Sequence, residues 1–305
     1  MKVLVTGASG FLGSYVCEQL VAGGHEVGAL VRREGSQPAG TTAVSGDLTD
    51  AASLRDALAG WRPEVVIHLA AEIASQRDPA KIEAANVTGT RDLIAASEAA
   101  GVERIVFTST VVTGDAHGEV LTEDSALPVE TAYGRSKQEG ERLLRDSSLE
   151  DIVIRPSHVY GPGGWFVEEF VNRLRQPGRF AVIGSGENWW DVVHVEDVAS
   201  ACVLAAQNAQ AGSLFHVVDD EPIHFYDFVA LASESLGLGA PRRIPSWLAR
   251  LAAGRDTVTA VTRSAKSSNA LIKSELGWSP GFPTSRTGVP DAIARLEDDG
   301  GSGRG

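Results

Sequence analysis

The sequence predicts an α/β fold, a doubly wound parallel sheet with a smaller C-terminal α/β lobe. Over the first half of the 305 residues, short apolar runs alternate with segments of helical periodicity, as they do in βαβ units. These runs are rich in β-branched residues and nearly free of polar ones, which is typical of strands buried on both faces. A glycine-rich turn separates the first apolar run from the first helical segment.

The elements of the first half follow from these patterns in chain order. Each predicted strand is a short apolar run, and the predicted helices are the segments with a helical pattern that lie between these runs. The strands are Val3–Thr6, Glu26–Val31, Ala43–Ser45, Val65–Leu69, Arg104–Thr108 and Ile152–Arg155, and the helices are Leu12–Ala22, Ala51–Ala59, Lys81–Ala100 and Ala132–Arg145.

The second half is less regular, and a turn cluster at Tyr160–Gly164 marks the change. We predict a first domain over residues 1–156 with returning elements near 184–216, an interleaved lobe over 157–297, and a disordered Gly-rich tail over 298–305. The elements predicted in the lobe are helices near Val167–Leu174, Val195–Gln207 and Tyr226–Leu236 and strands near Ala181–Ile183 and Leu214–Val218.

Charge and cysteine usage exclude several classes of function. The chain has 27 Lys and Arg against 40 Asp and Glu, a formal net charge of −13. This disfavours nucleic acid and an anionic membrane surface as partners, because both need a basic footprint. The two cysteines have no metal-binding spacing, so neither a disulfide framework nor a metal site is expected. No apolar run approaches the length of a membrane span, and we expect a cytoplasmic protein with a small-molecule substrate.

The turn after the first strand has the pattern of a phosphate-binding turn. It is Thr6-Gly7-Ala8-Ser9-Gly10-Phe11-Leu12-Gly13, between a predicted strand and a predicted helix, which is the context that the motif requires. Gly7 permits the tight turn, Gly10 lets backbone N–H groups approach a pyrophosphate, and Gly13 allows close packing of helix on strand. A tight turn without a ligand is the alternative. The pattern predicts a Rossmann-type dinucleotide site.

The tip of the second strand indicates which dinucleotide is bound. An acidic residue there would accept hydrogen bonds from a ribose 2′-hydroxyl, whereas arginine accommodates a 2′-phosphate. The sequence has Arg32 and Arg33 at this position, and the first acidic residue, Glu34, comes later. This favours NADP, with NAD as the alternative. A pair of solvated arginines would give the same sequence.

A tyrosine and a lysine suggest the chemistry. Tyr133 and Lys137 are four residues apart on a predicted helix and therefore share one face. A phenol with a pKa of about 10 is a poor base at neutral pH, but a neighbouring ammonium favours its ionised form. The strand before this helix ends in the hydroxyl residues Thr108, Ser109 and Thr110, at the edge where open α/β sheets bind ligands. A surface i,i+4 pair is the structural alternative.

Together these motifs make the sequence resemble an extended short-chain dehydrogenase/reductase of the NAD-dependent epimerase/dehydratase family. The resemblance extends to about Leu296, and its principal motifs are Thr-Gly-x-x-Gly-x-x-Gly at 6–13 and Tyr-x-x-x-Lys at 133–137. The further matches are Gly46-Asp47-Leu48, His68-Leu69-Ala70-Ala71, Asn86-Val87-x-Gly89-Thr90, Arg155-Pro156-x-x-Val159-Tyr160-Gly161-Pro162, His194-Val195-x-Asp197-Val198 and Glu275-Leu276-Gly277-Trp278.

The resemblance implies a role for each matched residue. It places Asp47 and Leu48 beside the adenine, the segment 69–71 beside the middle of the cofactor, and Pro156 near the nicotinamide. The expected cofactor-binding residues are Gly7, Ser9, Gly10, Phe11, Leu12, Gly13, Arg32, Asp47, Leu48, Leu69, Ala70, Ala71, Tyr133, Lys137 and Pro156.

The hydroxyl partner of Tyr133 is assigned by counting along the motif. Three residues past Phe107 stands Thr110, whereas counting back from Gly114 gives Ser109, because this loop is one residue shorter than the family pattern. We prefer Thr110 as the catalytic hydroxyl and keep Ser109 as the alternate that contacts the substrate.

Two departures from the family pattern bear on the reaction. Val111 and Val112 stand where the family's dehydratases carry Asp and Glu, and because apolar side chains transfer no protons, dehydration is disfavoured. His158 stands where some sugar epimerases have asparagine. It is a candidate for contact with a substrate hydroxyl, and a structural role is the alternative.

A third departure concerns the diphosphate of a nucleotide sugar. Trp190 replaces the arginine with which nucleotide-sugar epimerases clamp this group, and an indole offers one donor but no charge. Arg179, Arg255 or Arg263 could take its place. Trp190, together with Trp165 and Trp189, lines a pocket mouth or packs in the core.

The remaining histidines do not suggest a ligand site. His68 and His194 stand inside apolar strand patterns and are expected to be core residues whose ring nitrogens have protein partners. No cluster of His, Cys, Asp and Glu suggests a metal.

The expected function is that of an NADP(H)-preferring oxidoreductase. Hydride would pass between the nicotinamide and a carbonyl or secondary alcohol, sugars included, while Tyr133 exchanges the proton, Lys137 holds the ribose and lowers the pKa of the phenol, and Thr110 fixes the oxygen. The first alternative is a nucleotide-sugar 4-epimerase that retains NAD(P). The second is a non-catalytic dinucleotide-sensing module, which would not need the Tyr133/Lys137 pair. The resemblance further implies a homodimer whose helices at 81–100 and 132–145 form a four-helix bundle.

Overall fold

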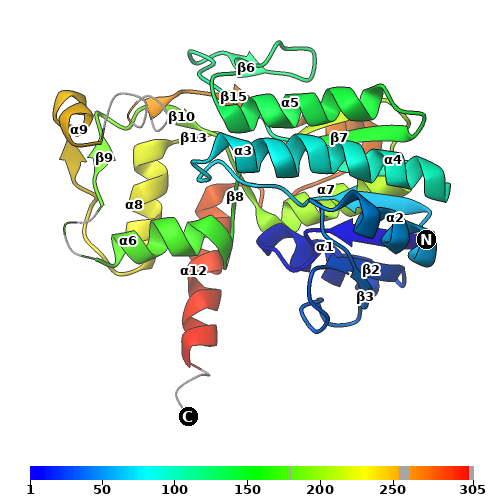
Figure 1. The fold of residues 1–305 in the computed structure, drawn as a ribbon. Helices are drawn as coiled ribbons and strands as arrows, with labels where there is room; N and C mark the ends of the chain where they lie inside the picture. Colours follow the sequence, from blue (N-terminus) through cyan, green and yellow to red (C-terminus); the bar gives the residue numbers. More distant parts are fainter. Residues whose placement is uncertain (177, 179, 254–257, 259–261, 302–305) are drawn as a thin grey trace.

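A seven-stranded parallel sheet forms the centre of the computed structural model, which describes residues 1–176, 178, 180–253, 258 and 262–301 (Figure 1). The strand order is β12-β7-β5-β4-β1-β2-β3. It reverses at β1, so a ligand crevice is expected at the carboxyl ends of β1 and β4. The strands are β1 (Lys2–Thr6), β2 (Glu26–Val31), β3 (Thr42–Ser45), β4 (Val65–His68), β5 (Arg104–Thr108), β7 (Glu150–Pro156) and β12 (Ser213–Val217).

Helices cover both faces of this sheet (Figure 1). On one face, helices bury residues such as Leu20 and Val198 against the strands, and on the other face they bury Leu54 and Leu93. The first set is α1 (Phe11–Ala22), α7 (Val195–Asn208) and α11 (Ala270–Leu276), and the second is α2 (Ala51–Trp61), α4 (Thr90–Ala100) and α5 (Ala132–Arg145). The predicted α/β class with a doubly wound parallel sheet is confirmed.

Residues 79–100 do not form the single regular helix that the sequence predicts from Lys81. A short helix α3 (Pro79–Ile82) continues into a π-helical segment η1 (Glu83–Gly89), and α4 follows. The side-chain amide of Asn86 bonds the backbone N–H and carbonyl of Glu72. A β-carbon on Gly89 would lie 2.7 Å from the carbonyl oxygen of Leu48. The π turn therefore holds both residues against the loops that follow β4 and β3.

A second group of elements packs around an aromatic core that includes Phe166, Phe170 and Phe228. It lies beside the carboxyl edge of the sheet (Figure 1). Its strands pair as β8 (His158–Tyr160) with β11 (Val192–His194), β10 (Trp189–Trp190) with β13 (Ile223–His224), and β9 (Val182–Ile183) with β14 (Arg243–Ile244). Its helical segments are η2 (Phe166–Val171), α6 (Asn172–Leu174), α8 (Phe225–Ser235), α9 (Ser246–Ala253) and α12 (Ser285–Gly301). A further pair, β6 (Val120–Leu121) with β15 (Lys266–Ser267), lies above α5 in Figure 1.

The end of the chain differs from the expected disordered tail. Helix α12 continues through Gly301, so the prediction of disorder is wrong for residues 298–301. The physical reason is that an established helix extends at little cost, since each added residue brings one backbone hydrogen bond. Residues 302–305 lie outside the described residues.

The division of the chain into two domains at residue 156 stays a prediction. Within the described part of the chain, no helix is long and apolar enough to cross a bilayer.

Candidate active site

The glycine turn after β1 leaves no room for a β-carbon at two of its positions, Gly7 and Gly13. Gly7 has a φ of +69°, and a β-carbon there would lie 2.8 Å from the backbone nitrogen of Ala70. A β-carbon on Gly13 would lie 2.0 Å from the carbonyl oxygen of Gly7. Gly10 caps α1 without a side-chain hydrogen bond, so the first N–H groups of this helix stay available at its positive end. The turn thus fits the phosphates of a dinucleotide.

The aromatic ring of Phe11 connects this turn to the second lobe. A β-carbon on Gly163 would lie 2.9 Å from Phe11 Cδ2, and one on Gly164 would lie 2.7 Å from Phe11 Cδ1. The ring therefore occupies the space that side chains at 163 and 164 would need. Ser9, at the tip of the turn, is exposed.

The segment after β4 and the residues after β3 reach the same edge of the sheet. The backbone N–H of Leu69 donates to the carbonyl of Thr6 at 3.3 Å, and that of Ala70 donates to Thr6 Oγ1 at 3.2 Å. Asp47 Oδ1 accepts two hydrogen bonds from Thr49, at 2.9 and 2.8 Å. These bonds, and the positive charge of Arg32, hold the pKa of Asp47 below its ordinary value. Arg32 itself is exposed at the tip of β2.

The two histidines assigned to the core differ in how fully they are hydrogen-bonded. The ring nitrogens of His68 both have partners, at 2.7 Å to Thr6 Oγ1 and at 2.9 Å to Thr90 Oγ1, and burial lowers its pKa to about 3. His194 Nδ1 accepts from the backbone N–H of Glu196 and caps α7. Its Nε2 has no partner among the described residues. The interpretation of His68 as a fully satisfied core residue is therefore confirmed, and that of His194 only in part.

Tyr133 and Lys137 begin helix α5, which Thr131 caps by accepting from the N–H of Gly134 at 2.9 Å. Lys137 is 3% exposed, and its Nζ lies 4.4 Å from the centre of the Phe107 ring. Burial raises the pKa of Tyr133 to about 12. Burial also lowers the pKa of Lys137 to about 8, against the opposing effect of the Glu141 carboxylate. At neutral pH the phenol is thus protonated and the amine mostly charged.

A hydrogen-bonded chain links the start of α5 to the π turn. Ser136 Oγ donates to the Tyr133 carbonyl at 2.8 Å and accepts from Asn86 Nδ2 at 3.0 Å. Asn86 in turn holds the backbone of Glu72. The loop after β4 and the backbone of Tyr133 are therefore positioned by one amide.

The two candidate hydroxyl groups at the end of β5 have different surroundings. Thr110 Oγ1 donates to the Pro156 carbonyl at 3.2 Å and accepts from the Val112 N–H at 2.9 Å. Ser109 Oγ is buried and has no partner among the described residues. A hydroxyl has only one proton to donate, so Thr110 must release Pro156 before it can donate to a substrate oxygen, whereas Ser109 has its proton free.

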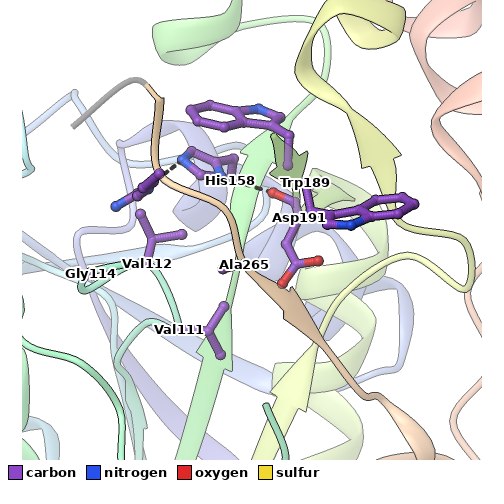
Figure 2. A pocket seen from close by; sticks show the side chains of 9 residues that line it. Val111, Val112, Gly114, His158, Trp189, Asp191 and Ala265 are labelled. Atoms are coloured by element: carbon purple, nitrogen blue, oxygen red, sulfur yellow. Dashed lines mark hydrogen bonds between the residues drawn. The ribbon is translucent and has the colours of Figure 1, made fainter. Parts of the chain in front are cut away.

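A narrow pocket opens beyond these hydroxyls (Figure 2). It holds about 10 Å³, room for about one water molecule. Figure 2 shows His158 at its centre, with Val111 and Val112 on one side and Trp189 and Asp191 on the other. The lining residues are Val111, Val112, Gly114, His158, Trp189, Trp190, Asp191, Arg263 and Ala265.

His158 is held by protein groups at both ring nitrogens. Nδ1 lies 2.8 Å from the carbonyl oxygen of Asp191, and Nε2 lies 2.6 Å from Arg263 Nη2. A carbonyl only accepts and a guanidinium only donates, so the ring is neutral, with its proton on Nδ1. Burial and the charge of Arg263 keep the pKa of His158 well below its ordinary value. A substrate hydroxyl would have to displace one of these partners.

The structure places the other aromatic and cationic candidates as follows. Trp189 and Trp190 line the pocket, while the Nε1 of Trp165 donates to the Val159 carbonyl at 2.7 Å. Of the three arginines considered as replacements for the diphosphate clamp, Arg263 reaches the pocket, and Arg179 and Arg255 lie outside the described residues.

Sequence reasoning missed the roles of Asp191, whose carboxyl lies in this pocket, and of Asn86, because their partners are far away in the chain.

The family of the chain follows from comparison with known proteins. Residues 3–218 match the model of the NAD dependent epimerase/dehydratase family. The chain belongs to this family. The relatives named below are reductases and an epimerase. The chain is therefore an enzyme of this oxidoreductase and epimerase family, and it has the fold of proteins that bind a nicotinamide dinucleotide.

Three relatives illustrate the range. The chain is 32% identical over 302 residues to a 3-diazoavenalumate denitrifying reductase of Streptomyces sp, covering 95% of this chain and 99% of the relative. It is 33% identical over 263 residues to a 2-alkyl-3-oxoalkanoate reductase of Stenotrophomonas maltophilia, covering 79% and 77%. The structure resembles that of a Thermus thermophilus UDP-glucose 4-epimerase in complex with NAD, with a TM-score of 0.83, 26% identity and coverage of 97% and 99%.

Proposed function

We propose that this protein is an NADPH-preferring reductase that converts a carbonyl group of a small substrate into a secondary alcohol. The observation that carries this proposal is the lining of the pocket next to Thr110. Val111 and Val112 supply no acid or base for elimination, and Trp190 supplies no charge, so that Arg263 is the one cation in the described lining. Tyr133 remains a protonated phenol at neutral pH and is suited to donating a proton to a reduced oxygen.

Each residue of the site has its own role in the proposed reaction. A bound nicotinamide dinucleotide would supply the hydride to the carbonyl carbon. Tyr133 gives its proton to the carbonyl oxygen and regains one from solvent, so that the substrate takes up one hydride and one proton. The ammonium of Lys137 stabilises the transient phenolate. The residues that would hold the dinucleotide are Gly7, Ser9, Gly10, Phe11, Leu12, Gly13, Arg32, Asp47, Leu48, Leu69, Ala70, Ala71, Tyr133, Lys137 and Pro156.

The test is a stoichiometric one. Purified protein is incubated with NADPH and a panel of aldehydes and ketones, and in parallel with UDP-glucose. A reductase consumes NADPH in proportion to the alcohol formed, and this consumption is monitored by the absorbance of NADPH.

The second candidate is a nucleotide-sugar 4-epimerase, which the similarity to the Thermus thermophilus enzyme supports. Interconversion of UDP-glucose without net change of cofactor would replace the first proposal by the second.

The two hydroxyl groups at the end of β5 can be distinguished by substitution. We expect Thr110→Val to lower kcat by roughly 10- to 100-fold, the size of one hydrogen bond to a developing charge, and Ser109→Ala to have a smaller effect. Steady-state rates of both variants, with thermal melting to check folding, make the measurement. A larger loss in Ser109→Ala would transfer the role to Ser109, whose hydroxyl has no described protein partner.

The preference for NADPH is assigned to the exposed Arg32. We expect Arg32→Gln to raise KM for NADPH by roughly 10- to 100-fold, the worth of one charge-assisted bond to a phosphate, and to leave KM for NADH nearly unchanged. Arg55→Gln, an exposed arginine on α2, is the matched control. Equal effects on both cofactors would contradict a contact with the 2′-phosphate.

We further propose a homodimer through α4 and α5, in a reducing compartment such as the cytoplasm. The exposed side of η1 and α4 carries the small residues Thr88, Ala95 and Ala99, which allow close approach of a second helix pair. Cys17 and Cys202 are buried free thiols, which supports a reducing environment. Light scattering should give twice the chain mass of 32.1 kDa, and a mass equal to one chain would contradict the dimer.

A further inference from the structure

A buried ion pair joins α5 to β7. Arg155 Nε donates to Glu141 Oε1 at 2.8 Å, and Arg155 Nη2 donates to Glu141 Oε2 at 2.6 Å. Glu141 is 5% exposed and Arg155 is 7% exposed. Taking two charges out of water is costly, and such a pair is often no more stabilising than apolar side chains of similar size. Stability alone therefore does not account for this pair.

The pair lies one helical turn from Lys137. Residues four apart on a helix are neighbours on one face, so Glu141 shares a face of α5 with Lys137. The Lys137 side chain is buried, and its Nζ lies 4.4 Å from the centre of the Phe107 ring. A β-carbon on Gly140 would lie 2.6 Å from Phe107 Cζ, so this ring packs against the backbone of the same face. The ring carries no charge, and the counter-charge on this face is the Glu141 carboxylate.

The other titratable groups described around the pair supply no buried negative charge. His68 on β4 is buried, and so is His216, which stands beside Arg155 in the register of β12 on β7. Burial lowers the pKa of His68 to about 3 and that of His216 to about 4, so both rings are neutral. Burial raises the pKa of Tyr133 to about 12. Glu123, which accepts from the His216 N–H at 2.9 Å, is only half-buried.

The charged residues of the other elements around α5 lie at the surface or at the far end of the sheet. Those of α3, η1 and α4 are Lys81, Glu83, Arg91, Asp92 and Glu98, of which only Asp92 is partly buried. Those of β5 and β7, apart from Arg155, are Arg104, Glu150 and Asp151, at the amino ends of the strands. Burial lowers the pKa of Lys137 to about 8, and the Glu141 carboxylate opposes this shift.

The ion pair also connects the two parts of the candidate site. Glu141 lies on the helix that carries Lys137. Arg155 directly precedes Pro156, whose carbonyl accepts a hydrogen bond from Thr110 Oγ1 at 3.2 Å. A change at the pair would therefore reach both the amine and the hydroxyl of the site.

We infer that Glu141, bound by Arg155, is the counter-charge that holds the buried Lys137 amine in its ammonium form. Both residues act through Lys137 and are positioning residues. A neutral amine would leave the phenolate of Tyr133 without the positive charge that stabilises it after proton donation. The inference rests on the proposed function for its effect on turnover, but not for its effect on the protonation of Lys137.

The protonation of Lys137 can be measured without turnover. The five lysines of the chain are Lys2, Lys81, Lys137, Lys266 and Lys273. Protein labelled with ¹³C at the lysine ε-carbons is titrated with pH and followed by NMR, and Lys137→Arg identifies the Lys137 signal by its loss. Wild-type protein should give a pKa of about 8 for Lys137. Glu141→Gln keeps an acceptor for Arg155 but no charge, and should lower the pKa of Lys137 by roughly one pH unit.

Two further variants separate charge from folding. Glu139→Gln breaks a matched pair on the solvent side of α5, where Arg142 donates to both Glu139 oxygens at 2.9 and 2.7 Å, and should leave the pKa of Lys137 unchanged. The double variant Glu141→Met/Arg155→Met leaves no unpaired charge in the core and should also lower this pKa. Thermal melting checks the folding of each variant. A wild-type pKa of Lys137 in Glu141→Gln, or in the double variant if Glu141→Gln does not fold, would overturn the inference.

Turnover provides a second readout that depends on the proposed function. With a pKa of about 7, roughly a tenth of Lys137 would be charged at pH 8, against about half in wild-type protein. Glu141→Gln should therefore lower kcat for aldehyde reduction by roughly fivefold at pH 8 and recover it at pH 6. Equal losses at both pH values in folded protein would contradict a role through charge. If wild-type protein reduces no aldehyde, the proposed function fails, while a lowered Lys137 pKa in Glu141→Gln still supports the inference.

Discussion

Replacement of Tyr133 by phenylalanine should lower kcat by roughly 10²- to 10⁴-fold, the usual contribution of a positioned general acid. The substitution removes the phenolic proton and keeps the ring, so packing at the start of α5 is preserved. Burial raises the pKa of this phenol to about 12, which means that the hydroxyl is the protonated, donating form throughout the neutral range. The loss should therefore appear in kcat, with little change in the dissociation constant of NADPH.

The measurement is steady-state reduction of an aldehyde together with titration of cofactor binding. Tyr226→Phe is the matched control, because this ring lies in the second lobe under the guanidinium of Arg243, 3.7 Å from its Cζ, and should leave turnover near the wild-type rate. A Tyr133→Phe variant that keeps its turnover would remove this residue from the mechanism.

Replacement of Gly13 by alanine should abolish dinucleotide binding. The new β-carbon would lie 2.0 Å from the carbonyl oxygen of Gly7 and 2.8 Å from Ala8 Cα, so the turn has to shift. It has little room to do so, because the backbone of Ala70 occupies the space that a β-carbon on Gly7 would need. Overpacking of this kind costs about 1–3 kcal/mol, and the displaced N–H groups no longer converge on a phosphate.

Thermal unfolding with and without NADPH checks this expectation. A ligand that binds only the folded state raises its stability by RT ln(1 + [L]/Kd). Wild-type protein should therefore melt at a higher temperature with NADPH, and Gly13→Ala should melt at the same temperature with or without it. Gly60→Ala is the control, because a β-carbon at Gly60, on α2, has no atom within 4 Å. It should keep the shift caused by NADPH and gain about 0.5–1 kcal/mol. A full shift in Gly13→Ala would contradict this account of the turn.

The parts of the fold that the sequence predicts well are those that local patterns determine. The predicted strands Glu26–Val31 and Arg104–Thr108 and the predicted helix Ala132–Arg145 have the same bounds in the structure. In each of them the apolar pattern or a cap such as Thr131 acts within a few residues. Most of the two- and three-residue strands of the second lobe have no such local signal. Val192–His194 is a strand only because it pairs with His158–Tyr160, and no periodicity encodes such a distant partner.

The candidate site divides in the same way. The glycine turn and the Tyr133/Lys137 pair are local motifs, so spacing alone identifies them. The contact between His158 and Arg263 joins residues 105 positions apart, and the free hydroxyl of Ser109 depends on what the surrounding strands leave unoccupied. Both properties arise from packing and carry no signal in the linear sequence.

The packing of Phe11 gives the glycines at 163 and 164 a meaning beyond turn formation. Gly164 has a φ of +55°, but Gly163 is not among the residues with positive φ, so backbone conformation does not require glycine there. What requires it is the ring of Phe11, which would meet any β-carbon at 163 within 2.9 Å. The aromatic residue of one lobe and the bare backbone of the other thus form a matched joint. A side chain added at residue 163 or 164 would push the second lobe, which bears the substrate, away from the half that holds the dinucleotide.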